Sequence, residues 1–268
     1  MKSSIKRFVV KLLTSMPYPI KYVVYTIWSI TTKAGRIADR GVRFVVSSWE
    51  EVVRSGEFYH LYFGHHYWWA SQNIPKGSRI LDLGCGTGYG SWYLAHSGNY
   101  VLGVDVHEKT IEWAKKHFKD ENLLFELRNP NDYNFGSSLY DYVVCFEVLE
   151  HLSEQSSFLQ GIFEALKQNG KLIISTANAG ENTVRAWLLN QRQATRNPGH
   201  VKELDLRKFE SLLKEYFRQV TLYGHCLKGA KDFNSWQKWR YKNNVKLADF
   251  EMRKDFINCE VIVAVCEK

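Results

Sequence analysis

Short apolar runs alternate with helix-length segments through the middle of this chain. The apolar runs cover residues 80–83, 100–106, 123–127, 140–146 and 170–176, and helical patterns cover residues 89–97, 110–118 and 157–167. Strands that alternate with helices in this way form a parallel sheet through right-handed crossovers, with helices on both faces. The pattern therefore predicts an α/β domain built around a mostly parallel sheet.

Two more strand-like runs, at residues 220–223 and 261–265, raise the predicted sheet to seven strands. A predicted helix over residues 206–216 precedes them. Between them lies a basic, aromatic-rich insertion at residues 231–256. We expect this insertion to elaborate the substrate side of the domain.

The first 55 residues have a different pattern and predict a basic, amphipathic helical extension. Residues 1–60 carry ten Lys or Arg against four acidic residues, which is most of the net charge of +8. Lys11, Lys21 and a Pro-Tyr-Pro break keep the apolar runs well below the about 20 residues that span a bilayer. An anionic membrane surface or a phosphate-bearing substrate suits such a segment, and so does a plain solvated face. We expect residues 56–268 to form the α/β domain.

The five cysteines contain no C-x-x-C pair. Two of them lie in strand-like apolar runs, where a free cysteine packs as a small hydrophobic residue. We expect reduced core cysteines in a cytoplasmic protein.

The glycine-rich turn after the first strand carries the most specific signal. Its sequence is D-L-G-C-G-T-G at residues 82–88, and Tyr89 stands where the dinucleotide fingerprint G-x-G-x-x-G would have its third glycine. This difference argues against a dinucleotide. The stretch resembles motif I of the class I S-adenosylmethionine (SAM) methyltransferases, which implies a Rossmann-like sheet of seven strands, one of them antiparallel. The resemblance implies that SAM is the cofactor, held at Asp82, Gly84, Cys85, Gly86 and Gly88.

A second acid, Asp105, ends the second predicted strand 17 residues after Gly88. An acid at this strand end can accept hydrogen bonds from both ribose hydroxyls of a nucleoside. By the same resemblance, Val106, Asn131, Asp132 and Phe146 are expected to contact the rest of the cofactor. The segment before the first strand, residues 49–72, is rich in aromatic side chains and is expected to fold over the cofactor.

Two further motifs bear on the acceptor. Residues 147–152, E-V-L-E-H-L, resemble the segment after strand four of the ubiquinone-biosynthesis O-methyltransferases. Residues 197–204, N-P-G-H-V-K-E-L, resemble a motif of methyltransferases associated with glycan and lipopolysaccharide synthesis. Both resemblances imply transfer of a methyl group to a hydroxyl.

The acceptor hydroxyl must lose its proton, and four residues are candidates for this chemistry. Glu147, Glu150 and His151 have i, i+3 and i+4 spacing, so a helix would carry them on one face. The resemblance to the ubiquinone-biosynthesis O-methyltransferases, whose matching residues bind a divalent metal, implies that these three residues and His200 could bind Mg, Mn or Zn. Without a metal, His200 and His151 could act as bases. The alternative is a structural role, with Glu147 capping a helix. A metal site from His60, His65 and His66 is weighed against packed histidines, which we favour because adjacent histidines on a helix point apart.

We therefore expect a SAM-dependent methyltransferase that acts on a hydroxyl of a small molecule, with a sugar or lipid-linked glycan first and a quinone-type phenol second. RNA 2′-O-methylation is a rival function, suggested by the basic charge, but nucleic acid is the less favoured partner. A SAM-binding scaffold without catalysis is the non-enzyme alternative. A cytoplasmic location, with peripheral attachment to the inner face of the membrane through residues 1–30, follows from the basic extension.

The membrane hypothesis gives a direct test. Deletion of residues 1–30 should release the protein from anionic vesicles in a sedimentation assay, because it removes both the basic charge and the apolar groups. SAM affinity should stay near its original value. Equal vesicle binding by the full-length and shortened proteins would refute a membrane-surface role.

Overall fold

The computed structural model describes residues 46–54, 58–129, 132–179, 200–228, 246–256, 259 and 261–268. Almost all of the predicted basic extension lies outside these residues, as do Asn131 and residues 231–245 of the predicted insertion. Among the helices that are described, none combines the length and the apolar character needed to cross a membrane.

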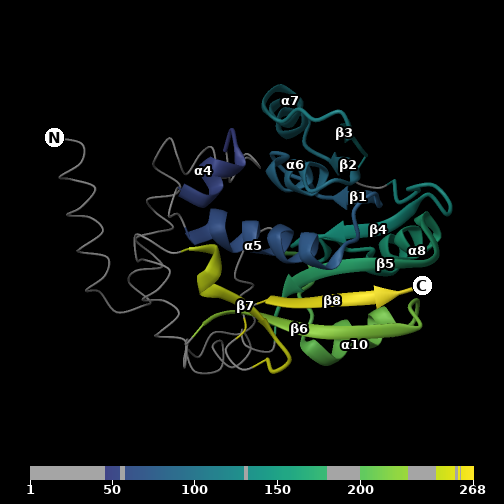
Figure 1. Ribbon diagram of the computed structural model, residues 1–268. Helices are drawn as coiled ribbons and strands as arrows, with labels where there is room; N and C mark the ends of the chain where they lie inside the picture. Colours follow the sequence, from purple (N-terminus) through teal and green to yellow (C-terminus); the bar gives the residue numbers. More distant parts are fainter. Residues whose placement is uncertain are drawn as a thin grey trace. The chain divides into compact units, whose positions relative to one another are not determined.

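The described strands form one sheet in the order β3-β2-β1-β4-β5-β8-β6-β7 (Figure 1). Their bounds are β1 Arg79–Leu83, β2 Tyr100–Asp105, β3 Leu123–Leu127, β4 Tyr140–Cys145, β5 Leu166–Ala177, β6 Gln219–Leu227, β7 Phe250–Arg253 and β8 Val261–Glu267. Strands β1 to β5 pair in parallel, and β8 is inserted antiparallel between β5 and β6. The predicted α/β class is confirmed.

The predicted count of seven strands with one antiparallel strand is wrong for the described chain, which contains eight. The additional strand is β7, from the end of the predicted insertion. It pairs antiparallel with the last four residues of β6, Gly224 to Leu227. Strand β6 is accordingly longer than the predicted run at residues 220–223, because β7 supplies hydrogen-bond partners for its end.

Two hydrophobic cores form because neighbouring residues of a strand point to opposite faces of the sheet. Ile80 of β1 and Ile173 of β5 contribute to one core, while Leu81 and Leu172 contribute to the other. The first core is covered by α4 Trp49–Arg54, α5 Phe58–Asn73, α6 Tyr89–His96 and α7 Glu108–His117, and the second by α8 Gln155–Ala165 and α10 Leu206–Lys214 (Figure 1). Helices therefore cover both faces, as predicted.

Three buried histidines attach α5 to the sheet. The rings of His65 and His66 lie 5.0 and 4.3 Å from the ring of His225 on β6. All three side chains are almost fully buried, and packed histidines were the favoured prediction. The side chain of His60 is not described.

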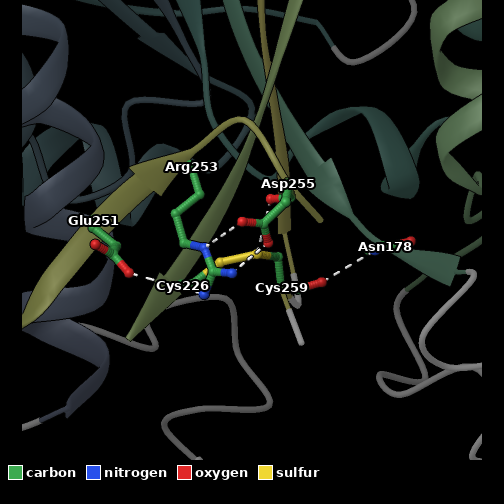
Figure 2. The surroundings of a disulfide bond; sticks show 6 residues. All are labelled: Asn178, Cys226, Glu251, Arg253, Asp255 and Cys259. Atoms are coloured by element: carbon green, nitrogen blue, oxygen red, sulfur yellow. Dashed lines mark hydrogen bonds and ion pairs between the residues drawn. A yellow bond between two sulfur atoms is a disulfide. The ribbon is translucent and has the colours of Figure 1, made fainter. Parts of the chain in front are cut away.

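The prediction of five reduced cysteines is wrong for one pair. Cys226 of β6 forms a disulfide with Cys259, as Figure 2 shows, while Cys85, Cys145 and Cys266 are buried free thiols. The two bonded residues are 33 positions apart, so the pairing of β6, β7 and β8 brings them together rather than any local motif. Gly224 makes room for the bond, since a Cβ at this position would lie 2.5 Å from Cys259 Sγ.

The histidine cluster predicts a loss of stability in acid. Burial lowers the pKa of His65 to about 4 and that of His66 to about 3, and it holds the pKa of His225 well below its usual value. In the unfolded chain the histidine pKa values are about 6.5. Between the folded and the unfolded pKa values, the unfolded chain therefore binds more protons than the folded protein. The histidine contribution to stability is complete above about pH 6.5 and is lost as the pH falls toward 4.

His225→Gln should reduce the pH dependence of the free energy of unfolding by about 1.4 kcal/mol per pH unit near pH 5, which is the contribution of one proton. Urea unfolding at several pH values measures this slope. Asp82 and Glu150 have raised pKa values and act in the opposite direction, so the difference between the variant and the parent protein is the informative quantity. His96→Gln, at a side chain that is 67% exposed, is the matched control. An unchanged slope in His225→Gln would contradict the prediction.

Candidate functional site

The glycine turn joins β1 to α6 and leaves one position open. Gly84, Gly86 and Gly88 all have positive φ angles, of 76°, 55° and 89°. A Cβ at Gly84 would lie 2.3 Å from the Val148 side chain, whereas a Cβ at Gly86 would meet nothing within 4 Å. The backbone at Gly86 can therefore be approached closely by a ligand, as the sequence predicts.

Asp105 connects this turn to the end of β2. Its carboxylate accepts hydrogen bonds from the Gly86 and His107 backbone N–H groups, both at 2.9 Å. Each carboxylate oxygen has a second lone pair, so the group could still accept bonds from a ligand. The apolar side chain of Val106 follows and is 44% exposed. An open glycine, a strand-end acid and an exposed apolar surface fit a nucleoside-bearing cofactor such as SAM.

Asp82 is fully buried and holds two helices against the end of β1. It accepts hydrogen bonds from Tyr67 of α5 at 3.2 Å and from Ser91 of α6 at 2.6 Å. Burial raises the pKa of Asp82 to about 7, although both hydrogen bonds oppose this rise. Direct contact between Asp82 and the cofactor stays a prediction.

The sequence did not reveal Tyr67 and Ser91 as partners of Asp82, but one signal was present. A Cβ at Gly90 would lie 2.2 Å from the Tyr67 ring. The glycine after the motif thus makes room for the ring, which reaches the carboxylate.

The other predicted cofactor residues have different surroundings. Cys85 is buried in the turn, and Phe146 packs against the Tyr67 ring at 5.0 Å. Asp132 is exposed, and its carboxylate accepts a hydrogen bond from the Asn134 N–H. Asn131 lies outside the described residues. Cofactor contacts of these residues stay predictions.

A second group of side chains lies at the carboxyl end of β4. Glu150, His151 and His200 offer ligand atoms that all lie within 4.8 Å of one another. Two of them belong to the short 3-10 helix η1, Leu149–His151, and His200 precedes α10. The His151 and His200 rings are 4.8 Å apart and nearly perpendicular. The structure therefore brings together three of the four residues predicted for acceptor chemistry.

Glu147 does not share a helical face with Glu150 and His151, so that prediction is wrong. It has a φ of 56° and lies outside the short helix η1. Its carboxylate accepts a hydrogen bond from Ser175, whereas the Glu150 carboxylate accepts one from Thr176. Because Ser175 and Thr176 are neighbours on β5, their side chains point to opposite faces of the sheet. The two glutamates are consequently separated.

Glu150 has an incomplete set of hydrogen bonds for a buried carboxylate. Its side chain is 0% exposed, and Oε2 accepts the Thr176 bond at 3.1 Å. Among the described residues, Oε1 has no hydrogen-bond partner. Burial raises the pKa of Glu150, while the backbone N–H of Glu150 and the nearby imidazoles of His200 and His151 oppose this rise. A buried acceptor without a donor is costly, so this oxygen fits a hydroxyl or a metal ion as partner.

Glu203 lies beside His200 and was not among the predicted site residues. Its Oε1 lies 2.5 Å from Nδ1 of His200, and the two side chains are only 8% and 10% exposed. The available signal was the H-x-x-E spacing within residues 200–203. A mixed oxygen and nitrogen set from Glu150, His151 and His200 would suit Mn, Zn or Fe by ligand type.

Comparison with known proteins agrees with this geometry. A family model described as "Methyltransferase domain" matches residues 74–249. Over 109 residues the chain is 40% identical to the mitochondrial ubiquinone biosynthesis O-methyltransferase of Schizosaccharomyces pombe, covering 39% of this chain and 40% of the relative. Over 120 residues it is 32% identical to the ubiquinone biosynthesis O-methyltransferase of Actinobacillus pleuropneumoniae, covering 42% and 50%. The chain thus spans half or less of these relatives' length.

The fold is shared with solved structures of low sequence identity. A SAM-dependent methyltransferase from Mesorhizobium loti aligns with a TM-score of 0.54 and 17% identity, covering 77% of this chain and all of the other. At this level of identity the likeness shows the fold alone.

Asp105→Ala should weaken SAM binding by roughly 1.5 to 3 kcal/mol, because it removes charge-assisted hydrogen bonds at the end of β2. Isothermal calorimetry measures the affinity, and circular dichroism verifies folding. Glu112→Ala, at an exposed acid on α7, is the matched control. Unchanged SAM affinity in a folded Asp105→Ala protein would overturn the assignment.

Proposed function

The chain belongs to the methyltransferase domain family and is a class I SAM-dependent methyltransferase, and from this premise we propose that it methylates a hydroxyl oxygen of a small molecule. The observation that carries the proposal is the group of Glu150, His151 and His200 at the carboxyl end of β4, in which Glu150 is buried and His151 is exposed. A hydroxyl acceptor must lose a proton during transfer, and this group contains the side chains that can take one.

The proposed roles, cofactor binding and proton acceptance, belong to two different regions of the protein. The turn at Gly84 to Gly88 and Asp105 would hold the cofactor, which supplies a methyl group on a positively charged sulfur when bound. His200 would accept the proton of the acceptor hydroxyl at Nε2, because Nδ1 is engaged by Glu203. Since methyl transfer is an in-line displacement, the remaining contribution of the protein is to hold the acceptor oxygen in position.

A metal-assisted version of the same reaction is the second candidate, supported by the unpartnered Oε1 of Glu150. Glu150, His151 and His200 would hold the ion, which would lower the pKa of the acceptor hydroxyl. Glu147 is not part of this group in the described structure.

For the acceptor class, we propose a quinone-type phenol first and a sugar or lipid-linked glycan second. The names of the curated relatives favour the phenol and reverse the order expected from the sequence. The motif at residues 197–204 supports the glycan. RNA is less favoured, because the relatives reported above are named for ubiquinone biosynthesis. Methyl transfer from labelled SAM to quinol precursors, lipid-linked glycans and RNA would identify the acceptor class.

His200→Ala should lower turnover by about 10²- to 10⁴-fold with little change in SAM affinity, because it removes the proposed base. The assay uses the acceptor identified by the screen, and His96→Ala is the exposed control. If the base acts alone, a chelator should have no effect. If a metal is bound, a chelator should abolish activity, added Mn or Mg should restore it, and Glu150→Gln and His151→Ala should be impaired as well.

Full activity of the double variant His151→Ala, His200→Ala would contradict both versions. Positioning of the acceptor would then be the source of catalysis.

A further inference from the structure

Glu203 stands next to the proposed base without belonging to the group that could touch an acceptor. We propose that Glu203 is a positioning residue that fixes the tautomer and the ring orientation of His200, so that Nε2 is the nitrogen used in the reaction. The inference rests on the proposed function for the role of His200, but the geometry of the pair is independent of it.

The direction of the hydrogen bond follows from the chemistry of the pair. A carboxylate has only acceptor atoms, so the 2.5 Å contact requires Nδ1 of His200 to carry the proton. In a neutral imidazole, Nε2 then has the lone pair. Carboxylates that accept Nδ1–H from a histidine set both its tautomer and its orientation. Without Glu203, either nitrogen of His200 could carry the proton.

The surroundings make this bond a strong constraint. The side chains of Glu203 and His200 are 8% and 10% exposed, so water does little to screen their interaction. An exposed pair would exchange its bond for water with little change in free energy. Here the loss of the carboxylate would leave a nearly buried ring N–H.

The backbone between His200 and Glu203 is fixed by hydrogen bonds to η1 and to α8. The Glu150 carbonyl accepts hydrogen bonds from the Val201 N–H at 2.8 Å and the Lys202 N–H at 3.1 Å. The Gln155 side chain donates to the carbonyls of Leu149 and Lys202 at 2.8 and 2.9 Å. These contacts tie the segment to η1, so the His200 ring is oriented relative to Glu150.

The residue that follows Glu203 is attached to the chain just after the end of β5. Leu204 is buried and pairs with Asn178 in an isolated bridge, and its carbonyl accepts the Ala179 N–H at 3.0 Å. Glu203 therefore lies between two fixed points of the backbone. Its carboxylate can orient the His200 ring because its own position is determined.

The test compares Glu203→Gln, which removes the charge, with Glu203→Asp, which keeps a carboxylate. The full-length protein is labelled with ¹⁵N-histidine, and His200→Ala assigns the His200 signals in nitrogen–proton correlation spectra. The parent protein should show the proton of His200 on Nδ1. In Glu203→Gln the proton should move partly or wholly to Nε2, and in Glu203→Asp it should stay on Nδ1.

Kinetics on the same proteins give the second readout. Glu203→Gln should lower kcat by about 10- to 100-fold, the usual effect of losing such a partner, while KM for SAM changes less than about 2-fold. Glu203→Asp should recover part of this loss. Glu210→Gln, at a more exposed glutamate on α10 that bonds Lys214, is the matched control and should change neither readout.

The positioning role is overturned if the parent His200 carries its proton on Nε2, or if Glu203→Gln lowers kcat without changing the tautomer. Unchanged kcat and tautomer in Glu203→Gln would overturn it equally. Failure of the proposed function looks different: His200→Ala would be fully active while the parent protein still shows the proton on Nδ1.

Discussion

The buried carboxylate of Asp82, at the end of the central strand β1, is the constraint on which the packing around the glycine turn depends. Burying an ionisable group is costly unless hydrogen bonds compensate, and Asp82 receives them from α5 and α6. These two helices can satisfy the carboxylate only if they pack on the same face of β1, directly beside the glycine turn. The position of α5 over the sheet is thus determined by a polar contact as well as by apolar packing.

The group of Glu150, His151 and His200 also contains a buried carboxylate, but the hydrogen bonds of this carboxylate are incomplete. Glu150 is also buried, but the described residues supply a donor to only one of its two oxygens. The Asp82 carboxylate, by contrast, accepts hydrogen bonds from two helices and so stabilises their packing. The Glu150 carboxylate keeps one oxygen without a donor among the described residues.

Strand and helix positions could be read from the sequence wherever the apolar pattern was continuous. The run at residues 123–127 matches β3, and the helix predicted from Tyr89 begins at the first residue of α6. The conformation of the glycine turn was predictable, because Gly84, Gly86 and Gly88 adopt the positive φ angles that favour glycine. The site was not predictable where tertiary contacts override local spacing. Glu147 has helical spacing to Glu150, yet adjacent hydroxyls on β5 draw the two side chains to opposite faces.

The pairing of β6 with β7 has a consequence for how this enzyme could diversify. Leu227 pairs with Phe250, and the Lys228 N–H donates to the Asp249 carbonyl at 2.8 Å, so the described residues on either side of residues 229–245 are hydrogen-bonded to each other. The entropic cost of joining two fixed ends grows only with the logarithm of the length of the connecting segment. Evolution can therefore lengthen, shorten or replace this segment while the strands and the group of Glu150, His151 and His200 keep their places. The pairing of β6 with β7 thus marks a position at which the chain can change in length without a change in the sheet.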